Sequence, residues 1–481
     1  MEINRFYIAG EFVTPNGKEK INLINPATEE KVGHVLSGSE IDVNEAVNAA
    51  KQAFLAASSL SLEQKKTILQ EIIDGMDERR EEFAQVISQE MGAPIKVARG
   101  AQFSSGKVHF FNTLKVLDNF SFSEVHDNIT LNKLPIGPVG MITPWNWPLN
   151  QMCTKIASAI AAGTSFVLKP SEITPGAAHL FAEVVDKTSM PKGMFNLIHG
   201  YGATVGRAMS EHKDLEMISF TGSTRAGIDI QKTAADSIKR VSLELGGKSP
   251  NIILDDVDLE KAVLMGMKQC FFNTGQSCSS PTRMLVPESM LDDATKHAVA
   301  VAEAMSTGDP QNEEIFLGPI SNKTQYEKVQ TLIQEGIDEG AQLACGGIGR
   351  PDGLERGFFV KPTVFTNVNN KMTVAQEEIF GPVICLIPYK DLDEAVEIAN
   401  DSPYGLSSMI SCGDEAKGHE IAKRIRTGQV IVNRQSRGEF PAPFGGFKMS
   451  GNGREHGLFG IDEYLDCLLY TSPSPRDQRG S

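Results

Sequence analysis

Long hydrophobic runs and blocks of basic residues are both missing from this chain of 481 residues. The most apolar stretch, residues 156–168, is interrupted by Ser, Gly and Thr and is shorter than the roughly 20 residues of a membrane-spanning helix. Lys and Arg total 46 against 61 Asp and Glu, a formal net charge of −15. Such a chain repels nucleic acid and anionic lipid. We therefore expect neither as a partner, and the acidic N-terminus predicts no export signal.

Cysteine is sparse and scattered. The seven cysteines are an odd number, with no Cys-x-x-Cys and no tight cluster with the nine histidines. This spacing disfavours a disulfide framework and a zinc site, so we expect no metal. Free thiols favour a reducing, cytoplasmic compartment.

Short β-rich segments alternate with helical stretches from residue 139 onward, which is typical of parallel, doubly wound sheets. The first series of expected strands covers 139–143, 165–168, 195–198, 217–220 and 240–244. The second series covers 251–254, 284–286, 383–388 and 429–432, with helices near 289–305, 321–339 and 413–426. An N-cap at Ser39 and a helical region near 62–90 precede them. The fold class predicted is α/β, with two Rossmann-like doubly wound domains and a small β oligomerisation arm.

Three residues stand out as candidates for chemistry. Cys278 lies among Gly and Ser, which leave room for a substrate and supply N–H donors to a thiolate nucleophile. Glu244 ends an apolar strand before two glycines, an environment that raises a carboxyl pKa and suits a general base. Asn146 is held between two prolines and two tryptophans and could donate to an oxyanion. Each residue taken singly has a competing interpretation. Cys278 could be a buried structural cysteine, Glu244 a surface or hinge residue, and Asn146 part of a Pro/Trp core turn.

Seven strings together make the chain resemble the NAD(P)-dependent aldehyde dehydrogenase superfamily, from about Tyr7 to about Leu465. Glu244 and Cys278 also stand 34 residues apart, as in that family. The strings are PWNWP at 144–148, LKPSE at 168–172, FTGSTRAG at 220–227, LELGGK at 243–248, GQSC at 275–278, EEIFGP at 377–382 and PFGGFK at 443–448.

The resemblance implies an NAD+-dependent oxidation of an aldehyde to the carboxylic acid. Cys278 would attack the aldehyde carbon, and the Asn146 amide with the Cys278 N–H would hold the oxyanion of the thiohemiacetal. After hydride transfer to the nicotinamide, Glu244 would deprotonate the water that hydrolyses the thioester. A CoA-acylating enzyme and a non-enzymatic binding protein are the alternatives. Glu244 argues against the first, and the intact trio argues against the second.

The resemblance also implies a set of cofactor-binding residues. Glu172 would accept hydrogen bonds from the adenosine ribose and repel a 2′-phosphate, which favours NAD over NADP. Ser223 would meet the pyrophosphate at a helix N-terminus. The full set is Thr143, Trp145, Lys169, Glu172, Gly222, Ser223, Glu378 and Phe380.

The implied substrate pocket has a mixed wall. Its residues are Trp147, Gln151, Thr154, Ser277, Ser279 and Phe444. Thr154 replaces an aromatic residue of relatives that take apolar or quaternary-ammonium aldehydes, so we expect a small or moderately polar aldehyde. Arg434 or Arg437 either binds a substrate carboxylate, as in semialdehyde oxidation, or lies on a surface loop.

We divide the chain into a discontinuous NAD-binding domain (1–118 and 136–247), a catalytic domain (248–447) and oligomerisation segments (119–135 and 448–466). Residues 467–481 are rich in Pro and Ser toward the end, and we expect a disordered, non-native tail there. Family resemblance implies a homodimer or homotetramer, whereas the altered tail argues against a stable higher assembly.

Overall fold

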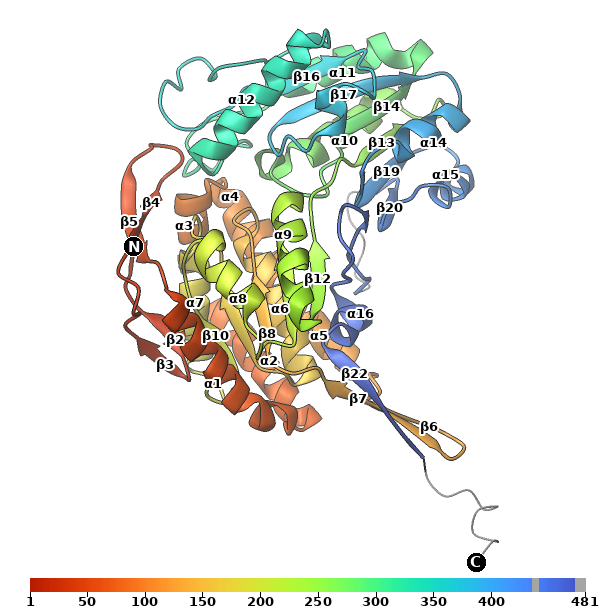
Figure 1. The fold of residues 1–481 in the computed structure, drawn as a ribbon. Coiled ribbons are helices and arrows are strands. Elements are labelled where there is room, and N and C mark those ends of the chain that lie inside the picture. The colour runs from red at the N-terminus through yellow and green to blue at the C-terminus, as the bar shows by residue number, and fades with distance from the viewer. Residues whose placement is uncertain (435–440, 472–481) are drawn as a thin grey trace, which may run out of the picture.

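Two seven-stranded sheets dominate the computed structural model, which describes residues 1–434 and 441–471 (Figure 1). In the first sheet five parallel strands are extended by an antiparallel hairpin. Its order is β12 (Arg240–Glu244), β11 (Met217–Thr221), β8 (Val139–Ile142), β9 (Phe166–Lys169), β10 (Phe195–Leu197), β2 (Phe6–Ile8) and β3 (Glu11–Val13).

The second sheet is parallel apart from one antiparallel edge strand, β15. Its order is β15 (Gln342–Cys345), β16 (Thr363–Thr366), β17 (Val383–Tyr389), β14 (Arg283–Pro287), β13 (Pro250–Ile253), β19 (Ser407–Ser411) and β20 (Gln429–Val432). The two doubly wound sheets confirm the predicted α/β fold class.

Helices surround each sheet, and several begin where the sequence provides a capping side chain. The Asp42 carboxylate accepts from the N–H and Oγ of Ser39 at the start of α1, as expected for an N-cap segment. The helices around the first sheet are α1 (Glu40–Ser58), α2 (Leu62–Glu78), α3 (Arg80–Met91), α4 (Ile95–Val97), α5 (Phe103–Leu117), α6 (Pro148–Ala162), α7 (Gly176–Val185), α8 (Arg207–Glu211), α9 (Thr224–Ala234) and α16 (Gly457–Asp462).

The second sheet carries its own helices. They are α10 (Leu259–Phe271), α11 (Leu291–Ala304), α12 (Lys323–Asp338), α13 (Thr373–Gln376), α14 (Leu392–Asn400) and α15 (Glu415–Ala422). The one helical region expected near 62–90 is two helices, α2 and α3. Arg79 separates them because its backbone leaves the helical region, with φ −111° and ψ 18°.

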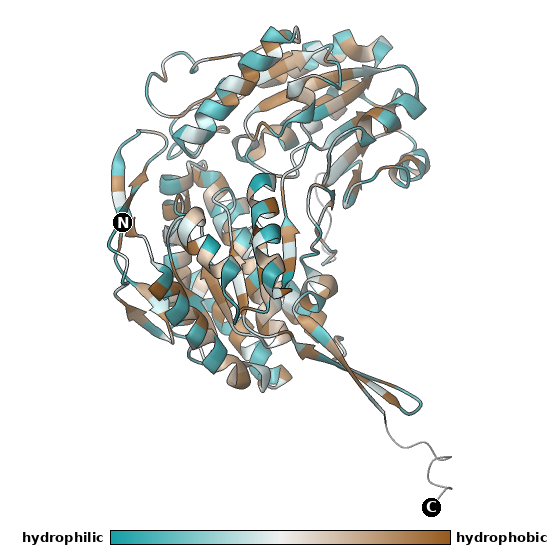
Figure 2. Ribbon diagram, viewed as in Figure 1, coloured by the Kyte–Doolittle hydropathy of each residue, from teal (hydrophilic) through white to brown (hydrophobic). Residues whose placement is uncertain are grey.

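Apolar residues gather on the strands of both large sheets (Figure 2). Around the first sheet, Phe166, Phe181 and Phe195 pack ring against ring in one buried cluster. Around the second, Ile252 and Ile253 belong to different clusters, because successive side chains of a strand point to opposite faces. Both faces are therefore covered, as parallel sheets require. In residues 1–434 and 441–471 no helix is both long and apolar enough to cross a membrane.

Three small sheets complete the fold. They are β1 (Glu2–Ile3) with β5 (Lys31–Leu36) and β4 (Lys20–Ile24), β18 (Tyr404–Gly405) with β21 (Phe447–Lys448), and β22 (Leu465–Thr471) with β7 (Ile129–Pro135) and β6 (Ser123–His126). The last sheet is antiparallel and projects from the body of the molecule (Figure 1). We call it the β arm.

The β arm corrects the expectation of a disordered tail from Cys467 onward. Residues 467–471 are ordered as part of β22, which pairs with β7 from Leu465 opposite Pro135 to Thr471 opposite Ile129. Among the described residues the ladder partner of β22 is β7, more than 300 residues earlier in the chain. Such a strand leaves no local signal, which is why composition misled the prediction. Residues 472–481 lie outside the described part of the chain. The predicted domain boundaries stay a prediction.

Candidate active site

The predicted catalytic residues meet between the two large sheets. Glu244 is the last residue of β12. Asn146 follows β8, and a single strand, β11, lies between β8 and β12 in the sheet. The carboxyl ends of parallel strands share one edge, where ligands of such sheets bind. Cys278 comes from the second sheet's side, after α10 and before β14. The chain therefore brings all three residues to one place from two different sheets.

Two cavities border Cys278. The first has a volume of about 140 Å³, and we call it the Glu378 cavity. It is lined by Pro144, Trp145, Asn146, Gln151, Thr221, Gly222, Ser223, Glu244, Leu245, Gly246, Cys278, Gln325, Lys328, Glu378 and Phe380. Asn146, Glu244 and Cys278 thus face the same space, together with five of the eight predicted cofactor residues.

The second cavity, of about 410 Å³, we call the Trp147 cavity. It is lined by Ser105, Trp147, Asn150, Gln151, Gln269, Phe272, Ser277, Cys278, Ser279, Ser280, Phe444, Glu455 and His456. Five of the six predicted substrate residues are among them. In the described part of the chain only Gln151 and Cys278 line both cavities. The thiol lies where the two spaces meet.

The backbone before Cys278 is strained and firmly supported. Asn273 and Thr274 have positive φ values of 55° and 58°, which side chains other than glycine rarely adopt. At Gly275, with φ 71°, a Cβ would lie 2.2 Å from the carbonyl oxygen of Gly381. The Gln276 side chain holds the loop because its Oε1 accepts from the Ser321 N–H at 2.9 Å. Strain of this kind persists where surrounding contacts fix the backbone, often at functional sites.

Asn146 is fixed by three hydrogen bonds. Its side-chain Nδ2 donates to the main-chain carbonyl oxygen of Gln276 at 3.0 Å. The main-chain carbonyl oxygen of Asn146 accepts from the side-chain amides of Gln102 and Asn273 at 3.0 and 3.1 Å. An amide nitrogen carries two hydrogens, so one remains for an oxygen beside Cys278. Such a pre-positioned donor stabilises a developing oxyanion.

Burial and nearby carboxylates act on the Cys278 thiol. Burial is the larger effect, and the charges of Glu378 and Glu244 add to it, so that the pKa of the thiol is raised to about 12. The thiol is therefore protonated at neutral pH in the protein alone. A nucleophilic attack by its sulfur needs a proton acceptor close by.

Glu244 is suited to accept a proton from the Cys278 thiol or from a water molecule. Its side chain is buried, and neither carboxylate oxygen has a hydrogen-bond partner among the described residues. Burial raises its pKa well above the usual range and the charge of Glu455 raises it further, whereas Lys155 and Arg454 act in the opposite direction. A carboxyl with such a raised pKa can exchange protons near neutrality.

Glu455 belongs to a buried ion pair next to Glu244. Lys155 Nζ lies 2.5 Å from Glu455 Oε1 and also donates to Ser219 Oγ at 3.0 Å. Lys155 and Glu455 are both buried, so their interaction is screened little by solvent. This pair sets part of the electrostatic potential at Glu244.

The Glu378 cavity has the features of a dinucleotide site. Ser223 caps α9, accepting from the Ala226 N–H at 3.3 Å, and the free N–H groups of a helix start attract phosphate. The Glu378 carboxylate accepts from the Gly247 N–H at 3.0 Å, and a Cβ at Gly246 would lie 2.4 Å from the same carboxylate. The Phe380 ring meets Trp145 edge to face with centroids 5.4 Å apart. These residues fit NAD.

Three predicted cofactor residues lie beside this cavity without lining it. Lys169 Nζ pairs with Glu172 Oε2 at 3.0 Å, and the Lys169 carbonyl oxygen accepts from the Thr143 N–H at 3.1 Å. Lys169 ends β9, the next strand of the sheet after β8, and Glu172 follows it. They are placed at the same sheet edge, as a ribose-binding pair would be.

One predicted substrate residue, Thr154, is not part of either cavity wall. Thr154 is 2% exposed and lines neither cavity, because only the first turn of α6, with Asn150 and Gln151, reaches the Trp147 cavity. Arg434 is exposed and does not line the cavity. Arg437 lies outside the described residues.

Several lining residues escaped sequence reasoning. Phe272 and Gln269 lie just before the Cys278 loop, so their proximity in the chain was a usable signal. Glu455, His456, Gln325 and Lys328 come from distant segments and gave none. No group of three or more His, Cys, Asp or Glu side chains suited to a metal ion occurs in residues 1–434 and 441–471.

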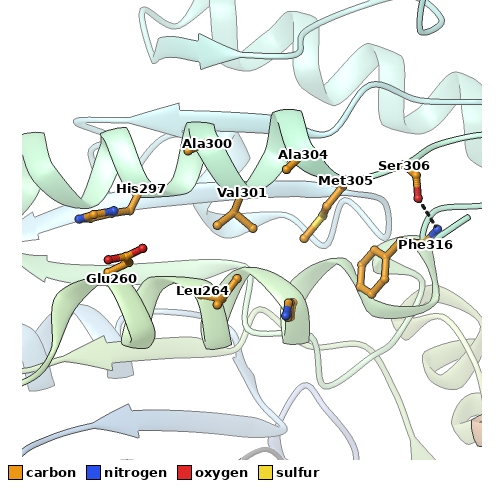
Figure 3. Close-up of a pocket in the computed structure, with 10 residues that line it drawn as sticks. Glu260, Leu264, His297, Ala300, Val301, Ala304, Met305, Ser306 and Phe316 are labelled. Carbon is orange, nitrogen blue, oxygen red and sulfur yellow. Dashed lines mark hydrogen bonds between the residues drawn. The ribbon is translucent and has the colours of Figure 1, made fainter. Parts of the chain in front are cut away.

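A third cavity, of about 380 Å³, lies between α10 and α11 and is largely apolar (Figure 3). Leu264, Val301, Met305 and Phe316 line it, with Glu260 and His297 at one end. None of the predicted site residues borders this α10–α11 groove. The size and apolarity of a cavity therefore do not by themselves identify the candidate active site.

Comparison with known proteins agrees with this geometry. The model of the aldehyde dehydrogenase family matches residues 12–468. The chain therefore belongs to the aldehyde dehydrogenase family, and it is an oxidoreductase of the aldehyde dehydrogenase class.

Individual relatives match over almost their full lengths. The chain is 47% identical over 466 residues to a 3-succinoylsemialdehyde-pyridine dehydrogenase from a Pseudomonas species, covering 97% of this chain and 98% of the relative. A crystal structure of aldehyde dehydrogenase C from Pseudomonas syringae, a cysteine-to-alanine mutant with NAD+ and octanal, is 48% identical with a TM-score of 0.96, covering 97% and 96% of the two chains. An aldehyde dehydrogenase from Mycobacterium tuberculosis with NAD+ is 36% identical, with a TM-score of 0.96 and 99% of both chains covered.

Proposed function

We propose that this protein oxidises an aldehyde to the carboxylic acid with NAD+ and water, through a thiohemiacetal and then a thioester on Cys278. The main support is that Cys278 lines both cavities, and that Asn146 and Glu244 line the Glu378 cavity with it. The test is NADH formation with a panel of aldehydes, followed by identification of the product. Acid supports the proposal, whereas acyl-CoA formed in the presence of CoA would favour the acylating alternative.

The chain's own residues carry the covalent steps and the proton transfers of thioester hydrolysis. Cys278 Sγ bonds to the aldehyde carbon, and the second N–H of the Asn146 amide, with the Cys278 N–H, holds the oxygen. Bound NAD+ supplies the hydride acceptor. The thiol proton passes to solvent, and Glu244 later takes the proton of the water that attacks the thioester. The Cys278 sulfur leaves as the acid forms and regains the proton held by Glu244, which restores the enzyme.

The proposed cofactor is NAD rather than NADP. Support comes from the fit of Ser223, Glu378 and Phe380 around the Glu378 cavity and from the two relatives whose structures contain NAD+. We assign the adenosine ribose to Glu172 and Lys169. A carboxylate there accepts from both ribose hydroxyls and repels a 2′-phosphate.

Changing Glu172 to Gln is expected to relax cofactor choice. The substitution removes the repelling charge and releases Lys169 Nζ, now 3.0 Å from Glu172 Oε2, to pair with a 2′-phosphate. We expect the ratio of kcat/KM for NADP to kcat/KM for NAD to rise about tenfold. Glu211→Gln, on the exposed side of α8, is the matched control. An unchanged ratio would remove the ribose assignment.

Changing Glu455 to Gln is expected to move the pH profile of acyl-enzyme hydrolysis to lower pH. The Glu455 charge raises the pKa of Glu244, and the Lys155 charge lowers it. Neutralising Glu455 therefore lowers the pKa of Glu244, because the raising charge is gone and the charge of Lys155 is no longer paired. Glu244 must be ionised to accept a proton from water, and its active form then persists to more acidic pH. Rates of thioester hydrolysis measured against pH check this.

A matched control for that experiment is Glu420→Gln, on the exposed surface of α15. A profile that stays in place in Glu455→Gln, or moves to higher pH, contradicts the electrostatic coupling of the two carboxyl groups.

The substrate is an aldehyde, and its finer identity is part of the proposal. One relative is named for a succinoyl-semialdehyde of pyridine, and another was crystallised with octanal. The loss of Thr154 from the wall removes the reason for expecting only small or moderately polar aldehydes. We therefore place the enzyme among NAD+-dependent aldehyde dehydrogenases that accept larger substrates in the Trp147 cavity.

We also propose a cytoplasmic homodimer or homotetramer. All seven cysteines are free, which suits a reducing compartment. The β arm exposes Leu468, Leu469 and Tyr470, and an exposed apolar edge strand favours pairing with another chain. Because β22 is a full strand of the arm, the argument against a higher assembly loses its basis. Light scattering of the purified protein measures the assembly, and a monomer would contradict the proposal.

A further inference from the structure

The Trp147 cavity is walled by two stacked pairs of rings. Trp147 and Phe272 lie with centroids 6.1 Å apart and planes at 30°, and Phe444 and His456 lie 5.6 Å apart at 27°. All four side chains are half-buried and line the cavity. Each ring therefore has one part packed and another part facing the space beside Cys278.

A hydrogen bond to Ser277 positions the Trp147–Phe272 pair. Trp147 Nε1 donates to Ser277 Oγ at 2.8 Å, and Ser277 directly precedes Cys278. The indole plane is thus fixed relative to the nucleophile. Phe272, the residue that follows α10, extends this flat surface along the cavity wall.

Main-chain hydrogen bonds position the Phe444–His456 pair. Phe444 and Glu455 exchange two N–H to carbonyl bonds of 2.7 Å, which brings His456 next to Phe444. His456 has φ 71° and ψ 150°, a backbone region that is essentially restricted to glycine. Strain at a non-glycine residue in a binding cavity indicates a side chain retained for its function.

The remaining wall is polar and mostly uncharged. Asn150, Gln151, Gln269 and Ser105 contribute amide and hydroxyl groups, while the charge of Glu455 is paired with Lys155. The cavity volume of about 410 Å³ falls within the range of roughly 300–1,000 Å³ for small-molecule sites. Flat rings face a space that also offers neutral hydrogen-bonding groups.

We propose that Phe272 and His456 are specificity-determining residues and that the preferred substrates are uncharged aldehydes that carry an aromatic ring. The ring would be held between the Trp147–Phe272 and Phe444–His456 pairs, with its aldehyde carbon at Cys278. Offset and edge-on ring contacts stabilise such a complex beyond simple burial of apolar area. The inference rests on the proposed function, because it concerns the aldehyde of the same reaction.

The test compares kcat/KM for benzaldehyde, octanal and acetaldehyde by NADH formation. In the parent enzyme we expect benzaldehyde to exceed both others. Phe272→Leu keeps an apolar side chain but removes the ring, and we expect the benzaldehyde-to-acetaldehyde ratio of kcat/KM to fall roughly tenfold. Phe316→Leu, in the α10–α11 groove (Figure 3), is the matched control and should leave the ratio unchanged.

His456→Gly separates a binding role from a structural one. Glycine adopts the observed backbone angles without strain, so the melting temperature should not fall, while the benzaldehyde-to-acetaldehyde ratio should fall roughly tenfold as the ring is lost. Unchanged ratios in both variants, or a parent enzyme that prefers octanal, would overturn the inference and leave the proposed function standing. Failure of the parent to oxidise any of the three aldehydes would count against the proposed function itself.

Discussion

Replacing Cys278 with Ala should abolish aldehyde oxidation, with kcat falling by at least about 10⁴-fold. The substitution removes the only sulfur that faces both cavities in the described part of the chain, and no hydroxyl or amine takes its place. Cofactor binding should persist because Ser223, Glu378 and Phe380 are untouched. Steady-state NADH formation gives the rate.

Cofactor binding to the variant can be followed by intrinsic fluorescence. Both tryptophans of the chain, Trp145 and Trp147, line the cavities at Cys278, so a ligand there should quench their emission. Cys345→Ala is the matched control, since Cys345 lies on β15 at the far edge of the second sheet. Turnover that survives in Cys278→Ala would remove the nucleophile assignment.

Replacing Glu244 with Gln should stop the cycle at the acyl-enzyme. Gln has the same shape but cannot accept a proton from water, so hydrolysis of the thioester should slow by about 10²- to 10⁴-fold. Hydride transfer comes before that step, and a burst of NADH close to one equivalent per active site should therefore precede a slow steady state. Intact-mass measurement should then find the protein heavier by one acyl group.

Glu260→Gln provides the matched control, because Glu260 lies on α10 at the α10–α11 groove (Figure 3), which Cys278 does not line. If Glu244→Gln turns over normally and carries no acyl group, another residue activates the water. If the burst itself disappears, Glu244 is needed to accept the thiol proton as well, as the raised pKa of Cys278 suggests.

The parallel sheets were predictable because their strands are short, apolar and separated by helices. The expected strands at 217–220 and 240–244 correspond to β11 and β12 within one residue. β16 and β19 were not predicted, although both are buried along their full lengths. A buried strand has no alternating pattern, and a short apolar run is ambiguous between strand and helix.

The proximity of Asn146, Glu244 and Cys278 was predictable from motifs, whereas the cavity walls were only partly so. Asn146, Glu244 and Cys278 each stand in a distinctive local string, and the fold brings them to one cavity. Thr154 does not line either cavity because α6 is buried along nearly its whole length, and only the first turn of that helix reaches the Trp147 cavity. Glu455 and His456 reach it from a segment almost 180 residues beyond Cys278, and only the folded chain reveals that proximity.

The near-complete separation of the two cavity walls has an evolutionary consequence. In the described residues, only Gln151 and Cys278 border both spaces, so mutations at Phe272, His456 or Asn150 can accumulate without disturbing the groups around Glu378. Descendants of one ancestral scaffold can therefore diverge in the molecules they consume while retaining a common electron carrier.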